Sequence, residues 1–292
     1  MDERLALGFV GIGIMGEAMV RRLLDRGWRV TVWNREPARL PTVVPHGAIA
    51  TGSPAEVAEA ADIVMLCVLN TEAVEACVFG PSGIASARRP PRTIVDLSTI
   101  DPDVTERIAA RLDGSAWVDA PVSGGPEKAR AGTLAIMAGG ADDAIAAVRP
   151  VLTDLGRATH MGGIGAGQRT KIVNQAIVAT GYVLMAEAVA LAEAAGIDAA
   201  AIPECLAGGM ADGALLQVIF RQMQARSFMP PRAYARQLLK DMVSIRGFAN
   251  ERSLSLPVVE SAIGAFARFA SRPGNEMRDP AEVVTAYTGQ RG

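Results

Sequence analysis

Lysine is scarce in this sequence: Lys128, Lys171 and Lys240 are three among 29 basic residues, and the others are Arg. Arg does not release its proton at ordinary pH, whereas Lys can be tuned to do so. Each lysine therefore marks a position where proton transfer is chemically available. Lys171 is followed by Asn174 and Gln175 three and four residues later, a spacing that places three polar side chains on one helix face.

Lys171 is the best candidate for a general acid or base. It is predicted to lie in the first turn of a long apolar helix, where the helix dipole and partial burial both disfavour a charged ammonium group. Lys128 follows a turn and is interpreted as a surface charge. Lys240 precedes Asp241, and an ordinary salt bridge to this neighbour is as good an interpretation as a functional role.

A glycine-rich turn directly follows the first apolar run, in the order Gly11-Ile12-Gly13-Ile14-Met15-Gly16. The first glycine permits a tight turn, the second lets the backbone approach a pyrophosphate, and the third lets a helix pack closely on a strand. The phosphates would bind free amide groups at the start of that helix. A strand before the motif and a helix after it are the context in which it predicts dinucleotide binding. The candidate cofactor-binding residues here are Gly11, Gly13, Ile14, Met15 and Gly16.

The end of the second predicted strand, 29–33, indicates which dinucleotide binds. An acidic residue there would bind the adenosine ribose of NAD, but this strand ends in Asn34-Arg35. Neutral Asn34 does not repel a 2′-phosphate, and Arg35 can bind one through charge-assisted hydrogen bonds. The sequence therefore favours NADP, without excluding NAD. The alternative is that Arg35 is a solvated surface residue.

A small polar turn follows another predicted strand, at Ser123-Gly124-Gly125. The carboxyl ends of strands face the ligand crevice in an open α/β sheet. Ser123 offers a hydroxyl group, and the two glycines offer unobstructed backbone amides, which together suit a substrate carboxylate. The simpler alternative is a turn that binds nothing.

Composition excludes several classes of protein. Half of the 292 residues are apolar and 21% are charged, which is typical of a globular protein with about two domains. The net charge of −2 creates no overall electrostatic field that would attract nucleic acid or an anionic membrane. Three separated cysteines and two histidines show no metal-ligand spacing. We therefore expect a cytoplasmic protein without a metal, a nucleic-acid partner or a membrane segment.

Apolar runs of strand length alternate with helical patterns up to about residue 160, and this alternation predicts a parallel, doubly wound Rossmann-type sheet. The glycine-rich stretch 160–167 ends the strand signal, and the rest of the chain reads as helical. We predict an NADP-binding domain over residues 1–163 and an all-α substrate and dimerisation domain over 164–292. The first helix of the second domain, 168–195, is apolar on nearly all sides. Other parts of the protein or another subunit must therefore shield it from water.

Five ordered motifs resemble the β-hydroxyacid dehydrogenase family, which includes 3-hydroxyisobutyrate dehydrogenases and tartronate semialdehyde (2-hydroxy-3-oxopropionate) reductases. The resemblance covers almost the whole chain. The motifs are the glycine-rich turn 11–16, the segments 96–100 and 119–125, the segment 167–174 around Lys171, and Leu239-Lys240-Asp241.

This resemblance implies hydride transfer between NADP(H) and the β-carbon of a short hydroxy acid. It implies that Lys171 is catalytic, that Ser123–Gly125 and Asn174 contact the substrate, and that Asn70, Thr99 and Lys240 contact the cofactor. Gln175, next to Asn174, is a further candidate for substrate contact. Many members have Asn at the position of Gln175, and the longer Gln is similar to the tartronate semialdehyde reductase branch. The family also implies a homodimer or homotetramer.

Two other functions remain open from the sequence. NADPH-dependent imine reductases resemble this fold, but they generally lack a lysine at the position of Lys171. A non-catalytic dinucleotide-binding module would be expected to have lost Lys171 or the Ser123–Gly125 turn, and both are present.

Overall fold

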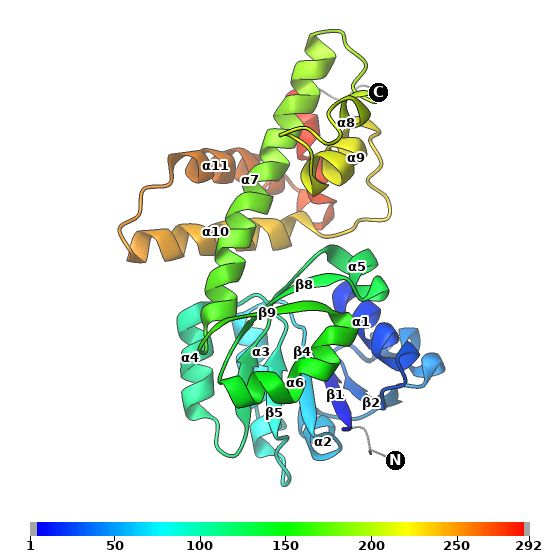
Figure 1. The fold of residues 1–292 in the computed structure, drawn as a ribbon, viewed down its shortest axis with the longest axis vertical. Coiled ribbons are helices and arrows are strands. Elements are labelled where there is room, and N and C mark those ends of the chain that lie inside the picture. Colours follow the sequence, from blue (N-terminus) through cyan, green and yellow to red (C-terminus); the bar gives the residue numbers. More distant parts are fainter. Residues whose placement is uncertain (1–4, 289–292) are drawn as a thin grey trace. The chain divides into compact units, whose positions relative to one another are not determined.

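The computed structural model describes residues 5–288 and divides into two compact units (Figure 1). The first unit ends at Lys171 and the second begins at Ile172. The predicted boundary, 163/164, lies before this division. The helix α7 (Ala166–Ala194) begins in the first unit and continues into the second.

Within the described residues, nine strands of the first unit form one sheet in the order β3-β2-β1-β4-β5-β6-β8-β7, with β9 paired to β8. Neighbouring strands from β3 to β6 are parallel, whereas β8 is antiparallel to β6 and β7. The strands are β1 (Leu7–Val10), β2 (Val30–Trp33), β3 (Ile49–Ala50), β4 (Ile63–Leu66), β5 (Thr93–Asp96), β6 (Ala116–Asp119), β7 (Val122–Ser123), β8 (Leu134–Gly139) and β9 (Gly156–Gly162).

The parallel strands end in register. Val10 pairs with Trp33 and Leu66, Leu66 pairs with Asp96, and Asp96 pairs with Asp119. The loops that follow these residues therefore leave the sheet at one edge, which is where an open α/β sheet binds its ligand. This arrangement confirms the predicted Rossmann-type sheet.

Helices cover both faces of this sheet. They are α1 (Ile14–Asp25), α2 (Pro54–Glu59), α3 (Thr71–Phe79), α4 (Pro102–Arg111), α5 (Gly125–Ala131) and α6 (Asp142–Leu155). One apolar cluster packs α1 and α6 on the sheet, and another packs α2, α3 and α4. The start of α4 shows why these segments are helical: the Asp101 carboxylate accepts the backbone N–H groups of Asp103 and Val104, and Pro102 opens the first turn.

The second unit is helical. It contains most of α7, with α8 (Ile202–Cys205), a π-helical turn (Leu215–Phe220), α9 (Arg221–Gln224), α10 (Ala235–Glu251), α11 (Pro257–Ala270) and α12 (Thr285–Thr288). Small and branched residues of α7, such as Ala179, Val183 and Ala186, pack in one core with Met242 of α10 and Phe266 of α11. This confirms the predicted all-α C-terminal part.

Some elements differ from the sequence prediction. The start of α7 is at Ala166 rather than at residue 168, so Lys171 lies in the second turn, where the dipole acts more weakly than the prediction assumed. The strand β9 occupies a segment for which no strand was predicted. It has few apolar side chains, and its pairing with β8 decides its conformation.

Candidate active site

The glycine-rich loop has the shape that a dinucleotide needs. Gly11 has φ +103°, and a Cβ there would collide with the Cys67 carbonyl of the neighbouring strand's loop. A Cβ on Gly16 would collide with the Gly11 carbonyl, whereas a Cβ on Gly13 would meet no atom within 4 Å. Gly13 caps α1, and no side chain caps this end. The open space at Gly13 and the uncapped amides of Ile14, Met15 and Gly16 fit a pyrophosphate.

Asn34 holds this loop in place. Its Oδ1 accepts the backbone N–H of Ile12 at 2.8 Å, and its Nδ2 donates to the Glu36 carbonyl at 2.9 Å. Arg35 beside it is exposed, and no described residue pairs with its guanidinium group. Asn34 therefore shapes the cofactor loop, while Arg35 remains available for an anionic ligand.

Lys171 is brought to the Ser123 turn by tertiary packing. The lysine is 6% exposed, and its Nζ donates to the Val122 carbonyl at 2.9 Å. Ser123, Gly124 and Gly125 follow directly, and both glycines have positive φ, +132° and +74°. The Lys171 amine, the candidate for proton transfer, thus lies beside Ser123–Gly125, the turn predicted to bind a carboxylate, and both belong to the first unit. Their functional roles remain predictions.

Two side chains that the sequence analysis gave no role hold the start of α7. Asp119, at the end of β6, accepts the backbone N–H groups of Gly165 and Gln168, both at 2.8 Å. Burial raises the pKa of Asp119 to about 6, against the opposing effect of these hydrogen bonds. The Gln168 side chain donates to the Ser98 carbonyl and accepts the Ile100 N–H. It thereby fixes the backbone on both sides of the predicted cofactor residue, Thr99. Asp119 ends a strand and begins the motif 119–125, and this position is the sequence signal that could have identified it.

Asn70 has a local role in the structure. Its Oδ1 accepts the Ala73 N–H at 3.0 Å and caps α3. Thr99 is half-buried in the loop after β5. Their predicted contacts with the cofactor remain predictions.

The remaining candidates lie in the second unit, on α7 and α10. Asn174 Nδ2 donates to Gln175 Oε1 at 2.8 Å, and Gln175 Nε2 donates to Asp241 Oδ2 at 2.5 Å. Lys240 Nζ forms an ion pair with Asp241 Oδ1 at 3.2 Å. The structure therefore joins Asn174, Gln175 and Lys240 through Asp241, for which no role was predicted.

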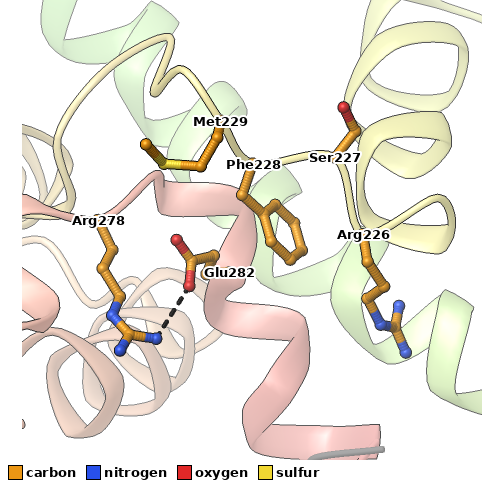
Figure 2. Close-up of a pocket in the computed structure, with 6 residues that line it drawn as sticks. All are labelled: Arg226, Ser227, Phe228, Met229, Arg278 and Glu282. Atoms are coloured by element: carbon orange, nitrogen blue, oxygen red, sulfur yellow. Dashed lines mark hydrogen bonds and ion pairs between the residues drawn. The ribbon is translucent and has the colours of Figure 1, made fainter. Parts of the chain in front are cut away.

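A cavity of about 480 Å³ in the second unit contains none of these residues (Figure 2). Its lining consists of Arg226, Ser227, Phe228, Met229, Arg278 and Glu282. Arg278 pairs with Glu282 at 3.1 Å, and Arg226 pairs with Glu193 at 2.8 Å. Because both guanidinium groups already have carboxylate partners, this cavity is a poor candidate for an anion site.

Two family descriptions match consecutive parts of the chain. Residues 6–165 match the "NAD binding domain of 6-phosphogluconate dehydrogenase", and residues 165–287 match "NAD-binding of NADP-dependent 3-hydroxyisobutyrate dehydrogenase". Among curated proteins, the chain is 35% identical over 282 residues to 2-hydroxy-3-oxopropionate reductase of Escherichia coli (strain K12), and this match covers 96% of each protein.

Solved structures agree with these matches. The 3-hydroxyisobutyrate dehydrogenase from Salmonella typhimurium has a TM-score of 0.88 at 27% identity, over 97% of this chain and 100% of that one. An imine reductase from Pseudomonas sp. has a TM-score of 0.62 at 22% identity, over 97% and 99% of the two chains. The second likeness shows a shared fold alone.

Proposed function

Because this chain belongs to the β-hydroxyacid dehydrogenase family and is an NAD(P)-dependent oxidoreductase, we propose that it interconverts a short β-hydroxy acid and its semialdehyde, with NADP as the preferred cofactor. The substrate class is that of a 2-hydroxy-3-oxopropionate reductase or a 3-hydroxyisobutyrate dehydrogenase. The cofactor supplies or accepts the hydride at the β-carbon.

The observation that carries this proposal is the buried Lys171 amine beside the Ser123 turn. A neutral Lys171 takes the hydroxyl proton during oxidation, and the protonated form returns it during reduction. The Ser123 hydroxyl and the backbone amides of Gly124 and Gly125 hold the carboxylate. A carboxylate held there leaves the β-carbon, rather than the α-carbon, to react.

The NADP preference rests on two side chains at the end of β2. Asn34 is neutral and is occupied with the loop backbone, so it does not repel a 2′-phosphate. The exposed Arg35 supplies a positive charge that no carboxylate among residues 5–288 pairs with.

The experiment that tests the function measures cofactor oxidation with four compounds in parallel: 2-hydroxy-3-oxopropionate, 2-methyl-3-oxopropionate, glyoxylate and a cyclic imine. Each is combined with NADPH and with NADH. We expect turnover of a semialdehyde with NADPH and none of the imine. Reduction of the imine alone would point to an imine reductase. Tight NADPH binding without any turnover would point to a non-catalytic module.

A further inference from the structure

The loop that follows β5 is held from two sides within the first unit. Toward the sheet, the Ser98 N–H donates to Asp96 Oδ1 at 2.9 Å, and Ser98 Oγ accepts the Val68 N–H at 3.0 Å. On the other side, the Gln168 side chain accepts the Ile100 N–H at 3.2 Å and donates to the Ser98 carbonyl at 2.9 Å. Gln168 therefore ties the first turn of α7 to this loop.

Both ends of the Gln168 amide are used, and the side chain is fully buried. An amide nitrogen only donates hydrogen bonds and an amide oxygen only accepts them, so this side chain matches one carbonyl and one N–H group of the loop. A buried backbone group that loses its partner costs about 1–3 kcal/mol. The two peptide units on either side of Thr99 are therefore held in one orientation relative to α7.

Lys171 leaves α7 on the same side as Gln168. The two residues lie three positions apart, which is about one turn and ~4.5 Å along the helix axis. Both side chains are buried, and Lys171 Nζ donates to the Val122 carbonyl at 2.9 Å. One helical turn thus sets the separation between the loop after β5 and the Lys171 amine.

The sheet topology indicates which half of a dinucleotide would lie beside this loop. The strand order β3-β2-β1-β4-β5-β6 is that of a Rossmann fold, in which each half of the sheet binds one mononucleotide. The glycine-rich loop after β1 fits the pyrophosphate, and the end of β2 belongs to the adenosine half. The nicotinamide half would then lie over the ends of β4 and β5, where residues 98–100 leave the sheet.

We propose that Gln168 is a positioning residue that holds the loop 98–100, and a nicotinamide ring beside it, at a fixed distance from the Lys171 amine. This inference rests on the proposed function. During reduction, the substrate carbonyl carbon accepts the hydride and its oxygen accepts the Lys171 proton, so both donors must fit one C=O group. A misplacement of ~1 Å can cost ~10²-fold in rate. A loosened loop should therefore lower kcat more than cofactor affinity.

The first variant, Gln168→Met, keeps the length of the side chain and removes both hydrogen bonds. With the semialdehyde that the wild type reduces, kcat per NADPH-binding site should fall at least ~10-fold. The Kd for NADPH should stay near the wild-type value, because the phosphate contacts lie at β1 and β2. Gln222→Met is the matched control that should keep kcat: Gln222 is also buried, and its amide has no hydrogen-bond partner among residues 5–288.

The second variant, Gln168→Glu, restores both hydrogen bonds in one protonation state only. An ionised carboxylate can accept the Ile100 N–H but cannot donate to the Ser98 carbonyl, whereas the protonated acid can do both. Burial and the carboxylate of Asp119, which accepts the N–H of residue 168, favour the protonated acid. The ratio of its kcat to that of the wild type should therefore rise from about pH 8 to about pH 6.

The corresponding ratio for Gln168→Met should not change with pH, because Met has no group to protonate. Titration of Lys171 and Asp119 is shared by all three proteins, so taking the ratio to the wild type removes it. Counting only the sites that bind NADPH corrects for any loss of folded protein. A purely structural role of Gln168 would therefore give no recovery of Gln168→Glu at low pH.

The proposal is overturned if Gln168→Met keeps the wild-type kcat, or if the ratio for Gln168→Glu is the same at both pH values. If the wild type reduces none of the compounds, the proposed function itself has failed. Hydrogen exchange of the Ile100 amide then decides on Gln168 separately. This amide should exchange slowly in the wild type and faster in Gln168→Met, and equal rates would contradict its attachment to Gln168.

Discussion

At the scale of single residues, Lys171 is notable because a buried amine needs partners, and the structure gives it the Val122 carbonyl at 2.9 Å. Arg at this position could form a similar contact but could not release a proton. At this position, one of the few lysines in the chain thus stands where proton release would require Lys rather than Arg. Lys240 differs from Lys171. Its ion pair with Asp241 is the ordinary salt bridge that the sequence offered as an alternative to a functional role.

Lys171→Met and Lys171→Arg should each lower kcat by at least ~10²-fold, the lower range for loss of a general acid or base. NADPH should still bind to both, as measured by fluorescence titration. Met has a similar length without the amine, and Arg keeps the charge without proton exchange. Near wild-type turnover of Lys171→Arg would rule out the proton-transfer role.

Arg35→Ala should raise the Kd for NADPH about 10-fold or more, since a charge-assisted hydrogen bond contributes about 1.5–3 kcal/mol. The Kd for NADH should not change, because NADH has no 2′-phosphate. Arg29→Ala removes an equal charge at the opposite end of β2 and should affect neither Kd. Tighter binding of NADH than of NADPH by the wild-type protein would contradict the NADP preference.

At the scale of elements, the start of α7 is held by Asp119 and Gln168 against the carboxyl edge of the sheet. These contacts fix the position of the helix that carries Lys171. Because the Asp119 carboxylate accepts backbone N–H groups, it caps this helix from a distant strand. A shift of α7 would move the Lys171 amine relative to the Ser123 turn.

Asp119 should also make stability depend on pH. Its pKa is raised from 3.8 to about 6, so the folded protein binds this proton more tightly than the unfolded chain does. The stabilisation is complete below the unfolded pKa and is lost as pH rises through the folded pKa. Between pH 4 and pH 8 this amounts to about 2 kcal/mol.

The comparison that isolates this effect is urea unfolding of the wild type and of Asp119→Asn at both pH values. Asn does not titrate, so the variant lacks this pH-dependent contribution at both pH values. Its stability should decrease less toward pH 8 than that of the wild type. Parallel pH dependence of the two proteins would show that Asp119 does not titrate in this range.

At the scale of the whole molecule, α7 exposes an apolar stripe formed by Val173, Ile177, Leu184 and Leu191, each 57–71% exposed. Their spacing of four and seven residues places them along one side of the helix. By length and hydropathy alone α7 could cross a bilayer, and 39% of its most apolar window is buried in the structure. Buried polar side chains, among them Gln168 and Gln175, are more typical of a core helix. We propose that further copies of the chain cover this stripe, as in a homodimer or homotetramer.

Light scattering should therefore give a dimer or tetramer for the wild type. Ile177→Asp/Leu184→Asp should dissociate it, because two charges would be buried in the contact. Ile49→Asp on β3, an apolar residue of the first unit with 53% exposure, is the control that should leave the assembly intact. A monomeric wild type would refute the proposal, and partitioning into liposomes would point to a bilayer as the cover.

Elements with a strong local signal in the sequence could be predicted without the fold. The glycine-rich turn and the apolar strands depend on nearest neighbours and on hydrophobic periodicity, so they could be predicted. The π-helical turn, β9 and the two-residue strands could not, because their conformation depends on distant partners.

Tertiary structure alone decided which polar groups meet. Nothing in the local sequence shows that Asp119 caps α7 across 46 residues, or that Asp241 reaches Gln175 across 66. Residue type identified Lys171 because a proton-releasing amine is a chemical property of one side chain. The orientation of Asn174 is a property of the folded chain, because an amide takes its direction from the partners that folding places beside it.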